Sequence, residues 1–501
     1  MKKRVKLTDI LTQRSLSSVP LEIAQYTSSV KSDVPIIDSV IEINKAHMVM
    51  LTRQGIININ DASQILKALN ELHLGTNLDP RLEDVHMHVE AYVIGKLGED
   101  VGGKLHVAKS RNDQVAAAIR MTLRTYLLEV VQALIELRKV LLTRCEEYSK
   151  TVMPGYTHLQ HGQPTTVAHL LLAYQDTLER DTERLMETFS RVNLSPMGAC
   201  AFATTSFNVD RELVAELLGF NGLVENSIDA VSARDFAVEA LAEFALIMTN
   251  LSRIGEELIL WSTSEFSTVK LPDEYSSTSS IMPQKKNPVV AELLRAKTAH
   301  VYSDLIAALT ILKALPLSYN LDLQEITPHL WNAYEVTLTS ITMANGLLKG
   351  LEFDAQRWLE LLATDFSTAT ELADMLVREH SIPFRTAYAI VKKLVQKISS
   401  EGKKITDITP EILSAAVMEA TGKKLRIDGE TLLKALDPVE SVGVKRVTGG
   451  PAPIEVLRMR NERVKKIGVD EQWCQAQLLL LKEAKSRLHR LIKKIEGGER
   501  V

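Results

Sequence analysis

The chain has 501 residues, which is enough for two or three domains with a large core. Its 59 basic and 63 acidic residues give a net charge of -4, which excludes a protein whose main partner is nucleic acid or an anionic membrane. The low counts of glycine (23) and proline (16), with only 5% aromatic residues, favour long helices.

The three cysteines, Cys145, Cys200 and Cys474, are far apart and show no C-x-x-C spacing. They predict neither a disulfide framework nor a zinc site, and they fit a reducing cytoplasm. The amino-terminal stretch MKKRVKLTDILTQRSL lacks the apolar core of a signal peptide, and no apolar run approaches the length that spans a bilayer. We therefore expect a cytoplasmic protein with no membrane contact and no cofactor.

Residues 1 to about 105 mix short helical patterns with glycine-containing turns, as expected of a smaller leading domain. Within it, Ser29 and Asp33 lie four residues apart and would share one face if the segment is helical. They could then offer a hydroxyl and a carboxylate to a ligand. The alternative is an ordinary pair of solvated polar side chains.

The string KSRNDQ, residues 109–114, combines two cations, a hydroxyl, an amide and a carboxylate just before a long helical pattern. Asn112 or Asp113 is predicted to cap that helix, and anion binding is favoured at a helix start. Capping alone explains Asp113 as well as a functional role does. It does not explain the whole string.

Apolar residues at steps of three and four predict four long helices. They begin near Asp113, where the pattern continues for about 30 residues, after Pro164, before Leu241 and after Pro288. Such helices would span about 45 Å, so we expect them to pack as a bundle whose apolar faces join subunits. The alternative is a long monomeric bundle.

A second string, GYTHLQHGQPTT at residues 155–166, contains Thr157, His158 and His161. Histidine exchanges protons near neutral pH and is the usual candidate for acid or base chemistry. Two histidines three residues apart also suggest a metal, but without a third ligand at useful spacing we predict none. A structural or surface histidine is the remaining alternative.

The third string is SSTSSIMPQKKNP, residues 276–288, whose hydroxyl residues predict a loop. Lys285 and Asn287 could hold carboxylates while Ser279 removes a proton from the adjacent carbon. A serine is a poor base unless its alkoxide is stabilised, which predicts a lid that closes around positive charge. Glu292 could orient His158. The alternative is a solvated basic linker.

Beyond about residue 360 the helical patterns shorten. Residues 362–435 predict modest helices, and residues 437–453 form a connection rich in glycine and proline. A final amphipathic helix follows, with Leu478, Leu481 and Leu488 on its apolar face.

The three strings together resemble the argininosuccinate lyases, a family of the fumarase/aspartase superfamily. The similar segments are KLHVAKSRNDQV, GYTHLQHGQPTT and SSIMPQKKNP, together with LPLSYNLDLQE at residues 315–325 and elements near Asp437 and Gly449. The resemblance covers most of the chain. It implies an all-α homotetramer whose active sites are assembled from three chains, which would explain why the strings lie so far apart in sequence.

The same resemblance implies three domains per subunit, at residues 1–112, 113–361 (the central long-helix bundle with the catalytic loop) and 362–501. It implies cleavage of argininosuccinate to arginine and fumarate by β-elimination. Ser279 would be the base, His158 the acid or proton relay, and Lys285 and Asn287 would hold the succinyl carboxylates. Thr157, Arg111 and Asn112 would lie beside those carboxylates. The residues that would hold the arginine portion are Ser29, Asp33, Tyr319 and Gln324.

Several positions depart from the family pattern. Thr278 stands where a glycine usually precedes the two serines, Val107, Ala108 and Lys109 replace T-G-R, and Thr327 replaces a lysine. An amino-terminal W-G-G-R-F stretch is also missing. These departures leave two alternatives open: a related fumarate-releasing lyase acting on adenylosuccinate or aspartate, and a catalytically silent structural homologue of the delta-crystallin kind.

Overall fold

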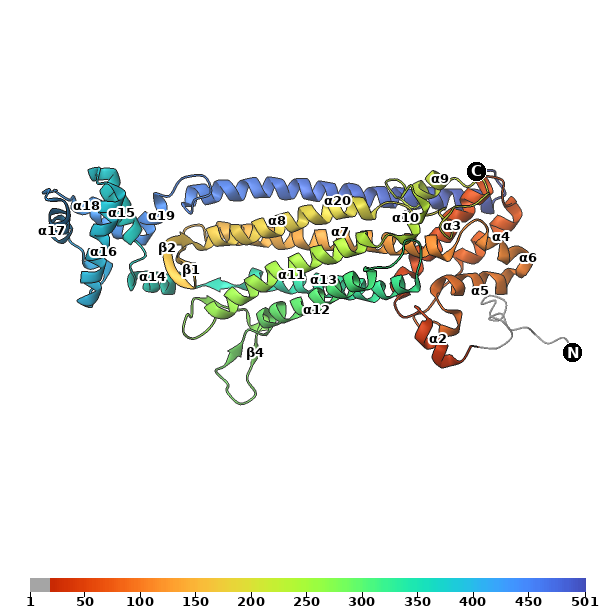
Figure 1. Ribbon diagram of the computed structural model, residues 1–501, viewed down its shortest axis with the longest axis horizontal. Coiled ribbons are helices and arrows are strands. Elements are labelled where there is room, and N and C mark those ends of the chain that lie inside the picture. Colours follow the sequence, from red (N-terminus) through yellow and green to blue (C-terminus); the bar gives the residue numbers. More distant parts are fainter. Residues whose placement is uncertain (1–18) are drawn as a thin grey trace.

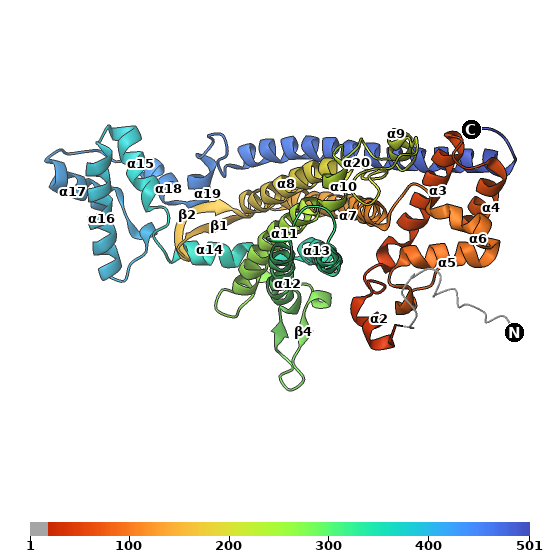
Figure 2. The same cartoon turned by 45° about the vertical axis from the view of Figure 1, so that its right-hand side comes forward.

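The computed structural model describes residues 19–501 as an elongated molecule built mainly from helices (Figure 1). Long helices run side by side through its middle, and a smaller helical unit lies at each end (Figures 1 and 2). The prediction of an all-α, multi-domain fold with a central long-helix bundle is confirmed. None of the helices within this range is long and apolar enough to cross a membrane.

The unit at the amino-terminal end surrounds its own apolar core. Its helices are α2 (Leu21–Thr27), α3 (Ile37–Arg53), α4 (Ile59–Asn70), α5 (Val85–Leu97) and α6 (Glu99–Gly102), with 3-10 turns η1 (Val34–Ile36), η2 (Pro80–Leu82) and η3 (Gly103–His106). Leu488, Ile492 and Ile495, from the last helix of the chain, complete this core. The first and last parts of the sequence are therefore packed together.

The central bundle contains the longest helices. They are α7 (Arg111–Glu147), α8 (Val167–Val192), α11 (Asp235–Trp261), α12 (Val289–Leu312), α13 (Ile326–Gly350) and α20 (Pro453–Glu496), with the short α9 (Arg211–Leu217) and α10 (Ser227–Ser232) and the 3-10 turns η4 (Asp273–Tyr275) and η5 (Leu321–Glu325). Buried Leu127, Leu134, Leu178 and Phe244 belong to one continuous core. The four predicted long helices are all present, and α7 runs for 37 residues rather than about 30.

The unit at the opposite end has a separate core that includes Leu372, Leu376, Ile390 and Leu394. Its helices are α14 (Ala355–Ala363), α15 (Ala369–His380), α16 (Phe384–Ser400), α17 (Pro410–Thr421), α18 (Gly429–Leu436) and α19 (Pro438–Gly443), with the 3-10 turn η6 (Ile405–Asp407). From there α20 returns along the bundle to the amino-terminal unit (Figure 1). The division at residues 112 and 361 stays a prediction, and its third part contains this returning helix.

The described residues also form three short antiparallel strand pairs. They are β1 (Val152–Thr157) with β2 (Gln160–Thr166), β3 (Val269–Lys270) with β6 (Glu352–Phe353), and β4 (Ser277–Thr278) with β5 (Lys286–Asn287). The sequence analysis anticipated none of them. The last pair turns the predicted serine-rich loop into a hairpin that projects from the side of the bundle (Figure 2).

One predicted helix cap needs correction. Helix α7 begins at Arg111 and is capped by Ser110, whose hydroxyl accepts from the Asn112 amide, so neither Asn112 nor Asp113 is the cap. The Asp113 carboxylate instead accepts from the Ser110 amide, which completes a capping box. Helix α8 begins at Val167, after Pro164 as predicted, and Thr166 caps it, whereas Pro164 itself lies in β2.

Candidate active site

One cavity of about 210 Å³ lies where the amino-terminal unit meets α7, α11 and η5, and we call it the inner cavity. Six of the twelve predicted site residues line it: Ser29, Asp33, Arg111, Asn112, Tyr319 and Gln324. They come from three separate stretches of sequence. The structure therefore brings together the four residues expected around the arginine portion and two of those expected beside the succinyl carboxylates.

Ser29 and Asp33 lie in the turn between α2 and η1 rather than on a helix, yet their side chains touch. The Ser29 hydroxyl donates to the Asp33 carboxylate at 2.7 Å, and the Val85 amide donates to the same oxygen at 3.1 Å. Asp33 is only 4% exposed, and this burial raises the pKa of its carboxyl to about 7. A cationic group entering the inner cavity would favour the ionised carboxylate.

Replacing Asp33 with asparagine is expected to raise the melting temperature more at about pH 8 than at about pH 5. The carboxyl has a pKa near 3.8 unfolded and about 7 folded, so the folded chain keeps a proton that the unfolded chain releases. Stability is therefore lost as pH rises through this range, and asparagine cannot ionise while its oxygen can still accept both hydrogen bonds. Thermal denaturation at the two pH values checks this. An equal drop in melting temperature at both would contradict it.

Arg111 is the first residue of α7 and is held by acids on the opposite wall of the inner cavity. Its guanidinium lies 3.0 Å from Glu83 and 3.1 Å from Asp84. Beside it, the Asn112 amide donates to the Ala201 carbonyl at 3.0 Å. Lys109, a departure from the family pattern, is buried behind this wall and donates to the Asn44 side chain. It is thus part of the packing and does not line the inner cavity.

Four ionisable residues that the sequence analysis missed also line the inner cavity: Glu83, Asp84, His86 and Arg234. The string EDVH at residues 83–86 concentrates two acids and a histidine around the start of α5, a signal that could have been used. Arg234 stands alone before α11 and carries no comparable signal. Thr327, the departure from lysine, also lines the inner cavity and contributes no charge there.

Thr157 and His158 lie at the exposed tip of the β1–β2 hairpin, away from the inner cavity (Figure 1). His158 and Leu159 form the turn, with φ angles of 55° and 58°. Positive values in two non-glycine residues are strained and are concentrated at functional sites. His161 is paired with Asp365, whereas His158 makes no hydrogen bond within residues 19–501. Of the two histidines, His158 is the one held free at the surface.

Ser279 follows β4 in the projecting hairpin, and its hydroxyl oxygen accepts from two backbone amides. The Ile281 amide lies at 3.3 Å and the Met282 amide at 3.1 Å. Hydrogen bonds to an oxygen favour its anionic form, so this local turn would stabilise a serine alkoxide. Thr278, which the sequence left unexplained, pairs with Lys286 in the strand ladder, where a β-branched residue is favourable.

The two lysines of the β4–β5 hairpin lie in different environments. Lys286 forms an ion pair with Asp273 at the base of the hairpin, whereas Lys285 is exposed. The Asn287 amide donates to the Ser277 hydroxyl at 3.4 Å. Glu292 is exposed in the first turn of α12, and within residues 19–501 it makes no hydrogen bond to His158. Its predicted contact with His158 would have to form between chains.

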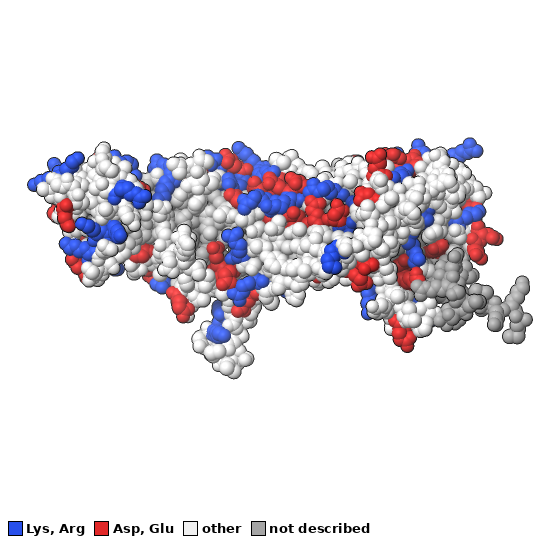
Figure 3. Space-filling view, in the orientation of Figure 1, with Lys and Arg blue, Asp and Glu red and all other residues white. Residues whose placement is uncertain are grey.

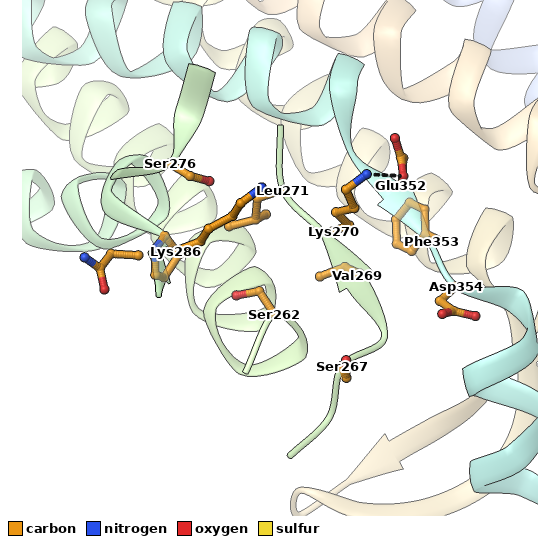
Figure 4. Close-up of a pocket in the computed structure, with 12 residues that line it drawn as sticks. Ser262, Ser267, Val269, Lys270, Leu271, Ser276, Lys286, Glu352, Phe353 and Asp354 are labelled. Atoms are coloured by element: carbon orange, nitrogen blue, oxygen red, sulfur yellow. Dashed lines mark hydrogen bonds and ion pairs between the residues drawn. The ribbon is translucent and has the colours of Figure 1, made fainter. Parts of the chain in front are cut away.

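A larger cavity of about 450 Å³ lies beneath the hairpin, and Figure 4 shows its lining. Lys270 on one wall is paired with Glu352 at 3.3 Å. Of the predicted residues, only Asn287 lines it, and neither Ser279 nor Lys285 does. We therefore consider the inner cavity, not this one, the part of the active site that a single chain supplies. Within residues 19–501 no cluster of His, Cys, Asp or Glu could hold a metal ion.

In one chain the inner cavity, the β1–β2 hairpin and the β4–β5 hairpin occupy three separate places (Figures 1 and 2). Each of these places contains residues from one of the three strings described in the sequence analysis, and the three places lie on different sides of the bundle or at different positions along it. The predicted catalytic groups therefore do not meet within one chain.

Comparisons with known proteins cover nearly the whole chain. A family model described as "Lyase" matches residues 7–303, and one described as "Argininosuccinate lyase C-terminal" matches residues 366–443. The argininosuccinate lyase of Methanocaldococcus jannaschii is 47% identical, covering 91% of this chain and 95% of that protein. The argininosuccinate lyase of Methanothermobacter thermautotrophicus is 48% identical, covering 89% and 95%.

Solved structures agree with these matches. An EDDS lyase in complex with formate superposes with a TM-score of 0.85 at 29% identity, covering 99% of this chain and 97% of that one. The class II fumarase of Schistosoma mansoni superposes with a TM-score of 0.69 at 18% identity, covering 87% and 94%, which shows the fold alone.

Proposed function

Because the chain belongs to the argininosuccinate lyase family and cleaves argininosuccinate to arginine and fumarate, we propose that its active site is completed by neighbouring subunits. The observation that carries this proposal is the separation of the three strings within one chain, each presented at an accessible position. A homotetramer would bring the inner cavity of one chain to the two hairpins of others.

The surface of the bundle supports such an assembly. Large apolar side chains are exposed on α11, α12 and α13: Leu246, Leu293, Tyr302, Ile306, Leu309 and Met343. Figure 3 shows few charged side chains over this part of the bundle, whereas a dense stripe of both charges follows α20. Exposed apolar patches of this kind mark protein interfaces. The proposed location of the tetramer is the cytoplasm, where the buried cysteines would stay reduced.

In the proposed mechanism, Ser279 removes a proton from the succinyl carbon next to a carboxylate. The amides of Ile281 and Met282 stabilise the serine alkoxide before the transfer, and Lys285 and Asn287 stabilise the dianion that forms. The electron pair of the carbon–nitrogen bond then leaves with the guanidino nitrogen. His158, oriented by Glu292, gives that nitrogen its proton, so fumarate and an arginine guanidinium are released.

At the other end of the substrate, Ser29 and Asp33 would bind the ammonium group of the arginine portion, with Tyr319 and Gln324 beside it. Arg111, Asn112 and Thr157 would complete the succinyl end. Burial raises the pKa of Asp33, and an ammonium group next to the carboxyl would oppose that effect and favour the ionised form that binds it.

The purified protein is expected to release fumarate from argininosuccinate, which the ultraviolet absorbance of fumarate follows directly. Adenylosuccinate and aspartate, offered separately at the same concentration, are expected to give no fumarate above background. Relatives matched at 44–48% identity are named argininosuccinate lyases, which favours this outcome. No fumarate from argininosuccinate at high protein concentration would favour the silent homologue, and turnover of another substrate would change the assignment.

A further inference from the structure

The turn that carries Ser29 and Asp33 is held on one side by the segment that leads into α5. The Ser29 amide donates to the Glu83 carbonyl at 2.9 Å, and the Val85 amide donates to the Asp33 carboxylate at 3.1 Å. Within the turn, the Ser32 hydroxyl and the Ser32 amide both donate to the Ser29 carbonyl at 2.9 Å. The Ser32 carbonyl takes no part in these contacts.

On its other side the turn is held by a tryptophan of the central bundle. The indole N–H of Trp331, on α13, donates to the Ser32 carbonyl at 3.0 Å, although the two residues are 299 positions apart in the chain. Trp331 packs against both the central core and the amino-terminal core. The Tyr126 ring meets it edge-on, with ring centroids 5.5 Å apart, and Tyr126 is itself stacked on Tyr334. These aromatic contacts fix the indole on the bundle side.

Trp331 is not among the residues that line the inner cavity, so it reaches the cavity only through this turn. It lies one helical turn beyond Thr327, which does line the cavity. A second contact from the same region, from the Gln324 amide to the Thr27 carbonyl at 3.4 Å, holds the other end of the turn. Side chains that bind a ligand keep their mutual geometry only when the backbone beneath them is supported. Trp331 supplies such support from outside the cavity.

We propose that Trp331 is a positioning residue for the arginine end of the substrate, because its indole N–H fixes the turn from which Ser29 and Asp33 bind the ammonium group. This inference rests on the proposed function, in which those two residues bind the arginine portion. The proton transfers take place at the succinyl end, on the two hairpins. Loss of the Trp331 hydrogen bond should therefore weaken the binding of arginine and raise KM for argininosuccinate, while kcat and the binding of a succinyl analogue stay unchanged.

The test measures the binding of arginine and of succinate, as probes of the two ends of the site, to the full-length protein by calorimetry. Trp331→Phe removes the N–H donor and keeps an aromatic ring. In this variant arginine should bind roughly threefold to tenfold more weakly, the range for one neutral hydrogen bond, whereas succinate should bind as it does to the wild type. Steady-state kinetics should show a similar rise in KM for argininosuccinate. If Trp331→Phe does not fold, Trp331→Met takes its place.

Trp331→His separates the hydrogen bond from the packing of the ring. An imidazole superposes on the five-membered ring of an indole, and at about pH 8 it is neutral and its Nε2–H can donate to the Ser32 carbonyl. This variant should bind arginine more tightly than Trp331→Phe does, although it has lost more of the ring. An equal loss of arginine affinity in the two variants would assign the effect to packing and overturn the inference.

Trp473→Phe is the matched control, because Trp473 is also partly buried and meets a neighbouring ring, that of Phe189, edge-on at 5.4 Å. Within residues 19–501 its indole N–H makes no hydrogen bond. This variant should bind both probes as the wild type does, even if its melting temperature falls.

Three results would overturn the inference: unchanged arginine affinity in folded Trp331→Phe, an equal weakening of arginine and succinate, or no binding of arginine to the wild type. Fumarate release from argininosuccinate by the wild type separates these outcomes from a failure of the proposed function. If fumarate is released, such results remove the role of Trp331 and leave the proposed function intact. If none is released, the proposed function itself has failed.

Discussion

Replacing Ser279 with alanine is expected to lower kcat for argininosuccinate by on the order of a hundredfold or more. The hydroxyl is the proposed base, and its oxygen already accepts two backbone amides that would stabilise the alkoxide. Alanine leaves those amides without an acceptor in an exposed hairpin, where water replaces the lost oxygen. The variant should therefore fold and bind substrate as the wild type does. Steady-state kinetics and a thermal melt measure both expectations.

Ser264→Ala is the control, because it makes the same substitution at an exposed serine after α11. Within residues 19–501 the Ser264 hydroxyl contacts only Glu265. It should retain wild-type kcat. Near-full activity of Ser279→Ala would assign the base to another residue. A loss of activity accompanied by a large fall in melting temperature would show instead that the hairpin turn, and not the proton transfer, had been damaged.

Two inactive variants, Ser279→Ala and His158→Asn, are expected to regain activity when they are co-expressed in one cell. The two residues lie on separate hairpins of a chain, so the proposed site takes each from a different subunit (Figures 1 and 2). If subunits mix at random, about a quarter of the sites would carry both native side chains. Each variant alone should be nearly inactive. The specific activity of the purified mixture is the measurement.

A double variant that carries both substitutions sharpens this result. Co-expressed in equal amount with the wild type, it should give about a quarter of wild-type activity if the site is shared, but about half if one chain supplies both residues. A mixture of the single variants that stays inactive, together with the value of one half, would show that each chain builds its own site.

Helix positions could be predicted well from this sequence, because long amphipathic helices leave a pattern that repeats over many turns. The helix after Pro288 begins at Val289 as expected. The error at α7 has a local cause, since Ser110, Asn112 and Asp113 can all cap a helix and only the surrounding contacts decide among them. Asp113 is drawn inward because the amides of Gly198 and Cys200 donate to it.

The site was less predictable, and the reason is geometric. The composition of strings such as GYTHLQHGQPTT indicates that they contain candidate acid–base residues. The hairpin that holds His158 was not predicted, because its turn consists of two non-glycine residues with positive φ and contains none of the usual turn residues. The sequence analysis missed Arg234 for another reason. What distinguishes it is that a buried arginine lines the inner cavity, and that property belongs to the folded chain rather than to any short stretch.

The return of α20 to the amino-terminal unit has a consequence for how the chain folds as it is synthesised. Leu488, Ile492 and Ile495 supply part of the core that also contains Ile43 and Leu66. While translation is in progress, that core lacks these side chains, so the unit around Ile43 and Leu66 cannot finish folding until Ile495 has left the ribosome. The small unit around Leu376 and Ile390 carries its own core and is free to fold earlier.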